Sequence, residues 1–551
     1  MSRFYADSDE NVSLAIQGYL ASNAARPLGM LMGEQNIKVV VRTDWDKSKV
    51  AILSGGGAGH EPAHVGFVGK GMLTAAIAGD VFASPSVEAV LQAIVAVTGE
   101  HGCLLIVKNY TGDRLNFGLA AEKARAMGYK VEMLIVGDDI SLPDEANPRG
   151  IAGTLFVHKL AGHLSEQGKS LEEIAAITRS ASERIYSIGL ALTSCALPYD
   201  ETGELSYAPE LGMGIHGEPG FEKVDISHAD DAVAILLEKL TPYTKDSTSR
   251  FAILINNLGS TTELELQIIT QKLLKSSLKS QIEIVLGPGA FMTSLNMYGI
   301  SLSLIELDDT IREALLSDVE PTAWPTPGVL GTFDRLPIQN LSNHSMFTPE
   351  QNPKVESLIV AICQALINEE SYLNGLDEKV GDGDTGTTFA QAARAILSKL
   401  QSEGMPLNST EKLFQCIGQE LSTVMGGSSG VLLSIFFTAA GSAKASTSSL
   451  ATSLLEGIAK VQEYGGAKLN DRTMLDAAIP AINALSKTED TVFASIAAQA
   501  GAEATTQMSK ARAGRSSYLR EDSLIGNIDP GAAAIAKVFH AIAQWSEALQ
   551  K

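Results

Sequence analysis

The chain is poor in cysteine, and its cysteines lack the spacing of a metal site or a disulfide framework. Only four occur among 551 residues, at Cys103, Cys195, Cys363 and Cys416, and none forms a CxxC pair. Isolated thiols of this kind are typical of proteins from reducing compartments. The first residues also lack a basic segment followed by an apolar one, as a signal peptide would have. We therefore expect the protein to be cytoplasmic.

Basic residues and long apolar runs are scarce as well. Lys and Arg number 42 against 64 Asp and Glu, which gives a formal net charge of −22. Nucleic-acid binding requires clustered positive charge. Apolar runs such as GVLLSIFFTAAG at 430–441 fall well short of the about 20 residues that cross a membrane. We expect neither a nucleic-acid partner nor a membrane span.

The first part of the chain alternates short β-branched runs with amphipathic stretches such as 117–128 and 262–276. This alternation predicts parallel or mixed sheets in an α/β architecture. We expect two sheets, one before and one after a helical region around 150–190. The predicted strands are 37–42, 50–54, 103–108, 131–136, 251–256, 282–286 and 302–307.

The second part of the chain has a different pattern. Residues 321–353 are dense in Pro, Asn, Ser and Thr, which is linker composition. From residue 354 onward, Ala- and Leu-rich periodicity predicts helices only. We therefore predict an α/β domain over 1–335, a linker over 336–353 and an all-α domain over 354–551. Fully extended, this linker would reach about 60 Å.

An acidic turn, LDEKVGDGDTGTTFA at 376–390, is the sharpest feature of the all-α part. It places three carboxylates within eight residues, on Asp377, Asp382 and Asp384. Such carboxylates repel one another unless they are exposed or bind a cation, and oxygen ligands suit Mg²⁺ or Ca²⁺. An EF-hand is excluded, because Thr387 stands where that loop needs Gly and Ala393 where it needs Glu. A plain exposed acidic turn stays open as the alternative.

Three further stretches place Gly, Ser, Thr or Asp before predicted helices. They are VMGGSSGVLLS at 424–434, YGGAKLNDRTMLDA at 464–477 and GNIDPGA at 526–532. Helix N-termini favour phosphate through their unpaired N–H groups. A tight helix–helix turn explains GGSSG equally well. With the acidic turn, these loops could hold a Mg–nucleotide without a Walker motif, of which the sequence has none.

Two glycine-rich loops in the first part each carry a histidine followed by Glu-Pro or Gly-Glu-Pro. They are GGGAGHEPAHVG at 55–66 and GMGIHGEPG at 212–220. Glycine lets the backbone approach a ligand closely. The first loop also matches the zinc-protease pattern HExxH, but that pattern needs His60 and His64 on one helix. Pro62 and the preceding glycines oppose such a helix.

A predicted strand, LLIVK, ends at Lys108 and is followed by NYTGDRLNFG. Open α/β sheets bind ligands at the carboxyl ends of their strands. We therefore favour a general base at Asp113 over a helix cap, and expect the two histidine loops to converge on it.

Together these motifs resemble the single-chain, ATP-dependent dihydroxyacetone kinases. The resemblance runs in order through GGGAGHEPAHVG, KNYTGDRLNFG, GDDISLP, GIHGEPG, KVGDGDTGTTFA, VMGGSSGV, DRTMLDA and DPGA, and covers nearly the whole chain. It implies phosphorylation of dihydroxyacetone, and also of glyceraldehyde, by ATP. It further implies an α/β substrate domain of two mixed-sheet subdomains and a C-terminal, all-α, nucleotide-binding helical barrel.

The resemblance also implies roles for the loop residues. His216 would hold the ketone as a covalent hemiaminal, Asp113 would accept the hydroxyl proton, and His60 would assist. The substrate pocket would be lined by Gly57, Ala58, Gly59, His60, Lys108 and Asp113, with Ala58 where many relatives have Ser. Asp377, Asp382 and Asp384 would hold two Mg²⁺ ions. The nucleotide would be bound by Asp384, Thr385, Gly386, Thr387, Ser428, Ser429, Gly465, Arg472, Asp529, Pro530 and Gly531.

Partners and alternatives follow from the same resemblance. The family forms homodimers in which each helical domain covers the partner's substrate domain. Some eukaryotic relatives also cleave FAD to a cyclic riboflavin phosphate in the helical domain, and nothing in the sequence excludes this activity. A non-catalytic dihydroxyacetone sensor is the less favoured alternative, since such relatives typically lose catalytic residues that this chain keeps.

Overall fold

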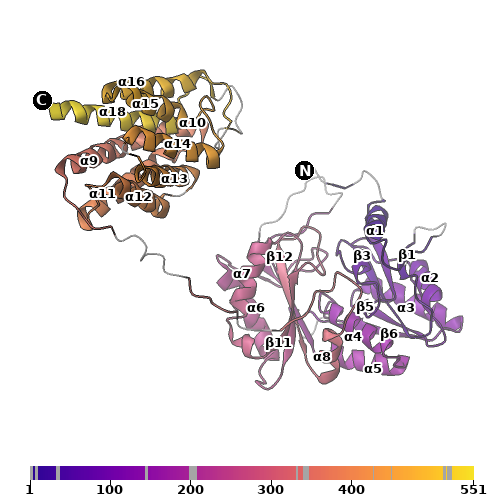
Figure 1. Ribbon diagram of the computed structural model, residues 1–551. Coiled ribbons are helices and arrows are strands. Elements are labelled where there is room, and N and C mark those ends of the chain that lie inside the picture. Colours follow the sequence, from indigo (N-terminus) through magenta and orange to yellow (C-terminus); the bar gives the residue numbers. More distant parts are fainter. Residues whose placement is uncertain are drawn as a thin grey trace. The chain divides into compact units, whose positions relative to one another are not determined.

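The computed structural model describes residues 4–5, 10–32, 37–142, 147–197, 208–329, 333–338, 347–425, 427–447, 449–512, 517 and 524–550. The chain folds into two compact units, Met1–Asp334 and Arg335–Lys551 (Figure 1). Residues 339–346 of the predicted linker lie outside the described residues. No helix in the described ranges is both long and apolar enough to cross a bilayer.

The first unit contains a six-stranded mixed sheet in the order β1-β2-β4-β3-β5-β6. Strands β4, β3, β5 and β6 run parallel, and β1 and β2 are antiparallel additions at one edge. The strands are β1 (Leu28–Met30), β2 (Lys38–Arg42), β3 (Ala51–Ala58), β4 (Ala75–Val81), β5 (Cys103–Lys108) and β6 (Val131–Val136).

Helices cover both faces of this sheet, which explains why β3 and β5 are buried along their whole length. Residues of α2 (Val87–Val97) and α3 (Thr111–Ala126) form the core on one face. Residues of α1 (Asn11–Ser22), α4 (Thr154–Glu166) and α5 (Leu171–Ser182) form the core on the other.

A second mixed sheet of seven strands follows, in the order β13-β11-β10-β12-β7-β8-β9. Among its neighbouring strands, β10 and β11 pair in parallel, and the other described pairs are antiparallel. One of its faces packs against α6 (Ala229–Leu240) and α7 (Glu263–Leu273), while α8 (Asp309–Leu316) joins the core shared with α4. The strands are β7 (Ile185–Ala191), β8 (Glu210–Leu211), β9 (Glu222–Lys223), β10 (Phe251–Asn257), β11 (Ile282–Gly289), β12 (Gly299–Glu306) and β13 (Gly328–Val329).

The second unit contains only helices among its described residues. Contacts run from α9 through α11, α12, α13, α14, α15, α16 and α18 back to α9, so the helices close a ring. They are α9 (Pro353–Asn368), α10 (Glu370–Val380), α11 (Thr385–Ser402), α12 (Thr410–Val424), α13 (Gly427–Lys444), α14 (Leu450–Gly465), α15 (Leu475–Thr488), α16 (Thr491–Ala504) and α18 (Pro530–Gln550).

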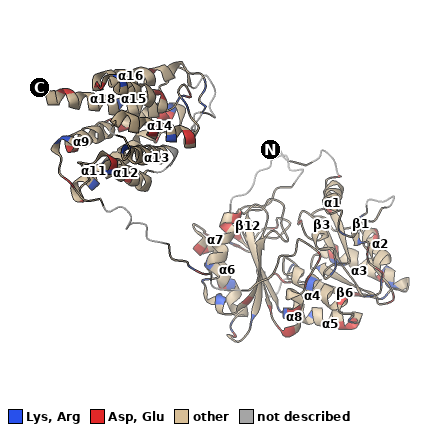
Figure 2. Cartoon of the chain, viewed as in Figure 1, with Lys and Arg blue, Asp and Glu red and all other residues tan. Residues whose placement is uncertain are grey.

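The predicted architecture is confirmed: two mixed sheets precede an all-helical unit. The sequence prediction missed six strands, however: the short strands β1, β8, β9 and β13, and the longer strands β4 and β7. β4 reads AAIAGDV, whose Ala and Gly have low strand propensity. β7 falls inside the region around 150–190 that was predicted to be helical. The observed helix α5 ends earlier, at Ser182, and β7 follows it. Basic and acidic residues are both spread over the two units (Figure 2).

Candidate active site

Two glycines at the carboxyl end of β3 are too tightly packed for side chains. A Cβ on Gly57 would lie 2.8 Å from the backbone nitrogen of Ala83, and one on Gly59 would lie 2.7 Å from the Phe82 ring. Gly59 also has a φ of +97°. Its N–H donates to the Glu61 carboxylate at 3.0 and 3.1 Å. Glycine is therefore required where β3 runs out into the loop that carries His60.

His60 is fixed in one neutral form. Its Nδ1 lies 2.8 Å from the carbonyl oxygen of Thr293, so Nδ1 carries the proton. Burial lowers the pKa of His60 well below 6.5, and the charges of Lys108 and His216 lower it further. Nε2 is therefore an unprotonated acceptor, and it is buried with no hydrogen-bond partner. Such an atom suits a ligand hydroxyl group, since a buried polar atom without a partner is costly.

Lys108 and Asp113 lie close to Gly56, at the carboxyl end of β5 and in the first turn of α3. A Cβ on Gly56 would be 3.3 Å from the Lys108 Nζ and 3.5 Å from the Asp113 Oδ2. Both side chains are buried, and neither Nζ nor Oδ1 has a hydrogen-bond partner. Burial lowers the pKa of Lys108, against the opposing charge of Asp113. The N-cap of α3 is Tyr110, so Asp113 is not the cap residue.

His216 lies in the second glycine-rich loop, after β8, and is enclosed by aromatic rings. Its ring centroid is 4.9 Å from that of His60, 4.5 Å from Tyr110 and 5.3 Å from Phe82. The two histidine loops therefore meet each other at these rings. Tyr110 and Phe82 belong to the site too. Tyr110 could have been found from its place in NYTGD, whereas Phe82 gave no sequence signal.

The HExxH pattern does not form a zinc site. Residues 61–64 form turns followed by a short 3₁₀ helix at Val65–Phe67, so no α-helix carries both histidines. The His64 ring lies against His158 instead, with centroids 5.2 Å apart. Within the described ranges, the group of His, Cys, Asp or Glu side chains with metal-binding geometry is the aspartate cluster of the other unit.

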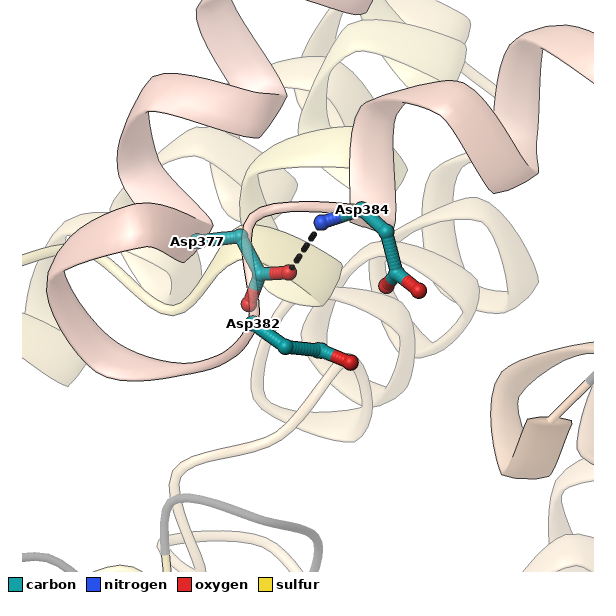
Figure 3. A group of neighbouring side chains, drawn as sticks. All are labelled: Asp377, Asp382 and Asp384. Atoms are coloured by element: carbon teal, nitrogen blue, oxygen red, sulfur yellow. Dashed lines mark hydrogen bonds between the residues drawn. The ribbon is translucent and has the colours of Figure 1, made fainter. Parts of the chain in front are cut away.

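The three aspartates gather at the turn between α10 and α11 (Figure 3). Their carboxylate oxygens lie within 4.8 Å of one another. Asp377 is buried, and its Oδ2 accepts the N–H groups of Asp384 at 3.0 Å and Thr385 at 3.1 Å. Asp382 and Asp384 are more open to solvent. This all-oxygen, triply acidic set fits Mg²⁺, because the cation would offset the repulsion between the carboxylates.

The start of α11 packs closely on α10, which positions the residues after Asp384. A Cβ on Gly386 would clash with the carbonyl oxygen of Glu370. Thr387 exchanges two hydrogen bonds with the Asn374 side chain, both of 2.9 Å. The first-turn N–H groups of α11 therefore face the same turn as the aspartates.

Two further loops of the helical unit meet beside this turn. Arg472 is 1% exposed; its Nη2 donates to the carbonyl of Asn527 at 2.8 Å, while Nε and Nη1 are buried without partners. Asp529 accepts the N–H of Ala532 and so caps α18, whose first residue is Pro530. Burial raises the pKa of Asp529 to about 6, and the charge of Asp377 adds to this effect. A Cβ on Gly531 would lie 3.3 Å from Met474, so the two loops touch.

Other predicted nucleotide residues lie at helix ends. Ser428 and Ser429 are in the first turn of α13, as the Gly/Ser motif predicted, although the Ser428 side chain lies outside the described part. Gly465 is the last residue of α14 and packs against Leu432 of α13. The predicted triose residues and nucleotide residues thus lie in different units.

Comparison with known proteins covers both units. A Dak1 domain matches residues 22–323 and a DAK2 domain matches residues 379–544. The chain is 50% identical over 549 residues to a dihydroxyacetone kinase of Citrobacter freundii, with 99% of each covered. It is 39% identical over 561 residues to triokinase/FMN cyclase of Homo sapiens, with 96% of each covered.

A solved structure agrees with these sequence matches. The crystal structure of the C. freundii dihydroxyacetone kinase in complex with AMP-PNP and Mg²⁺ matches with a TM-score of 0.83 at 48% identity, and covers 99% of this chain and 100% of that one. The matches span the α/β unit and the helical unit alike. The chain therefore belongs to the dihydroxyacetone kinase family.

Proposed function

We propose that the protein transfers the terminal phosphoryl group of ATP to dihydroxyacetone, and also to glyceraldehyde. The observation that carries this proposal is a set of three buried groups with unpartnered atoms: His60 Nε2, on the ring next to His216, and Lys108 Nζ and Asp113 Oδ1, both next to Gly56. A small molecule with hydroxyl groups and a carbonyl would satisfy all of them. The 50% identity to the C. freundii dihydroxyacetone kinase supports the choice of molecule.

On the substrate side, His216 attacks the ketone carbon with a ring-nitrogen lone pair, and the C=O electron pair moves to oxygen, which takes a proton. The triose is then held as a hemiaminal while its terminal hydroxyl group reacts. Asp113 accepts the proton of that hydroxyl group, and His60 Nε2 accepts a hydrogen bond from the triose. Glycerol has no carbonyl group, so this bond selects against it.

On the nucleotide side, Asp377, Asp382 and Asp384 hold the metal, for which we propose two Mg²⁺ ions per site. Bound Mg²⁺ neutralises the charge of the ATP phosphates during phosphoryl transfer. The nucleotide is bound by the N–H groups of Gly386 and of the first turn of α13, by the hydroxyl groups of Thr385 and Thr387, and by the Arg472 guanidinium. The C. freundii complex with AMP-PNP and Mg²⁺ supports this assignment.

We also propose a homodimer in which each helical unit serves the substrate unit of the partner. The reach of the predicted linker, about 60 Å, permits this exchange. Coexpression of His216→Ala with Asp384→Ala tests it. An exchanged heterodimer contains one intact pair of sites and regains activity, whereas without exchange every pair contains one damaged site and stays inactive. A cytoplasmic location is proposed as well, supported by four free cysteines.

The activity itself is tested by incubating the purified protein with Mg²⁺, ATP and either dihydroxyacetone or glycerol, and by measuring the ADP and triose phosphate formed. Turnover of the ketone but not of glycerol supports the proposal. FAD cleavage in the helical unit, which the resemblance implied for some relatives, is the alternative, and the human relative is named triokinase/FMN cyclase. Absence of kinase turnover together with release of AMP from FAD in Mn²⁺ would favour it.

A further inference from the structure

Only one of the two nitrogens of His216 can attack a ketone, and the loop around it distinguishes them. Nδ1 of His216 lies 3.2 Å from Oε1 of Glu218. The other carboxylate oxygen, Oε2, accepts the backbone N–H of His216 at 3.0 Å. One carboxylate therefore binds both the ring and the backbone of the same residue, which restricts the orientation of the imidazole.

The loop is built to accommodate this carboxylate. A Cβ on Gly214 would clash with Oε2 of Glu218, so glycine is needed there. The N–H of Gly214 donates to the carbonyl of Glu218 at 3.0 Å. Arg149 donates to the carbonyl of Gly212 at 2.7 Å and is itself paired with the buried Asp139. These contacts hold Glu218 in place from its own loop and from a neighbouring segment.

The carboxylate stays charged in this position. Although burial acts to raise the pKa of Glu218, the hydrogen bonds that its carboxylate accepts from the ring and the backbone of His216 act to lower it, and the pKa falls to about 2. An ionised carboxylate only accepts hydrogen bonds. Nδ1 must therefore carry a proton, which leaves the lone pair of the neutral ring on Nε2. The Thr293 carbonyl fixes His60 in the same tautomer.

We propose that Glu218 is a positioning residue that selects Nε2 of His216 as the nucleophile and balances the positive charge of the ring once the carbon–nitrogen bond has formed. This inference rests on the proposed capture of a ketone by His216. The Nε2 lone pair forms the bond to the carbonyl carbon, the C=O electron pair moves to oxygen, and that oxygen takes a proton from solvent. The substituted ring then carries one positive charge beside the carboxylate.

The test combines Glu218→Ala, Glu218→Gln and the matched control Glu222→Gln, an exposed glutamate on β9. ¹⁵N spectra of histidine-labelled protein without substrate report the tautomer of His216, whose signals are identified by their loss in His216→Ala. We expect Nδ1–H in the wild type, in Glu218→Gln and in the control. In Glu218→Ala we expect the Nδ1–H form to be lost, because its acceptor is gone.

The same proteins are then given ¹³C-labelled dihydroxyacetone. We expect Glu218→Ala to reduce the bound, tetrahedral carbon signal by about tenfold to a hundredfold, the range for loss of a hydrogen bond to a charged group. Glu218→Gln should restore most of it, and the KM for ATP should not change. A wild-type tautomer and signal in Glu218→Ala would overturn the inference. If the wild type itself forms no adduct, the proposed capture fails, while the tautomer still tests Glu218 independently.

Discussion

The two sites differ most in burial and charge. His60 and Lys108 in the substrate unit are 0% exposed and Asp113 is 3% exposed, whereas Asp382 and Asp384 in the helical unit are open to solvent. Burial lowers the pKa of His60 well below 6.5, so the ring next to His216 stays neutral. A site that takes up Mg–ATP gains from charged groups in contact with water. In the proposed mechanism, capture of the triose and binding of Mg–ATP therefore take place in opposite surroundings, which separate units can supply.

His216→Ala should give the largest effect and remove the defining chemistry of the buried site. We expect kcat/KM for dihydroxyacetone to fall about 10⁴-fold or more, since covalent attachment supplies positioning worth several orders of magnitude. His101→Ala, at an exposed histidine just before β5 and so at the opposite end of that strand from Lys108, is the control. Steady-state kinetics with both variants measures the effect. A fall below tenfold would show that the histidine does not capture the substrate.

Asp113→Asn should separate capture from transfer within the same site. Loss of a general base lowers kcat by about a thousandfold, while the triose should still bind to His216. Kinetics gives the first quantity, and the ¹³C signal of bound dihydroxyacetone gives the second. Loss of both together would instead make Asp113 a binding residue.

Asp384→Asn should affect the exposed site alone. We expect the apparent affinity for Mg–ATP to fall by about tenfold to a hundredfold, because one metal ligand loses its charge. Triose capture should be unchanged. Glu378→Gln, at an exposed glutamate of α10, is the matched control. Weakened triose capture in Asp384→Asn would contradict the division of labour between the units.

Acid should act on the two units in opposite directions. Burial lowers the pKa of His158 to about 3 and those of His60 and His64 well below 6.5. The unfolded chain therefore binds more protons below about pH 6.5, and each histidine costs the folded unit up to about 1.4 kcal/mol per pH unit. Burial raises the pKa of Asp138 to about 6, and this shift stabilises the folded unit in acid, but it offsets only part of the loss caused by the histidines.

In the helical unit the sign is reversed. Burial raises the pKa of Asp529 to about 6, so its folded carboxyl group keeps a proton that the unfolded chain releases near pH 4. That contribution is present at low pH and is lost as the pH rises through 6. Hydrogen exchange of the full chain without Mg²⁺, at pH 7 and pH 5.5, should show weaker protection of the substrate unit and stronger protection of the helical unit at the lower pH. Parallel changes in both units would refute the assignment.

Ala58→Ser should have the smallest effect. Ala58 is 5% exposed at the end of β3, and in the proposed site this loop would contact the substrate through its backbone. A buried hydroxyl group that finds a nearby acceptor changes stability by about 1 kcal/mol, and we expect kcat/KM to change by less than about threefold. A larger loss would mean that the side chain itself faces the triose.

Much of this comparison could be predicted from the sequence, for physical reasons that differ between the units. The Asp triad lies within eight residues, so spacing alone places its carboxylates together. Glycines around His60 and His216 indicated backbone loops, and the end of LLIVK located Lys108 and Asp113 at a strand terminus. Each of these signals is local in the chain.

The remainder depends on tertiary contacts. Phe82 stacks on the His60 ring, although no sequence pattern distinguishes Phe82 from its neighbours. Thr293 fixes the tautomer of His60 from 233 residues away in the chain. Glu218 stands in the GIHGEPG motif, but its role depends on two contacts that only the structure shows: Oε1 with Nδ1 of His216, and Oε2 with the backbone N–H of His216. Strand β4 was missed because its Ala and Gly have low strand propensity, and Gly79 is needed there since a Cβ would clash with the carbonyl oxygen of Ala83.

Dihydroxyacetone labelled with ¹³C at the carbonyl carbon, bound to the wild-type protein and to His216→Ala without ATP, gives the most direct test of the central claim. The account predicts a tetrahedral carbon signal with the wild type that is absent with His216→Ala. A bound triose that keeps its carbonyl signal in the wild type would contradict covalent capture of the triose by His216.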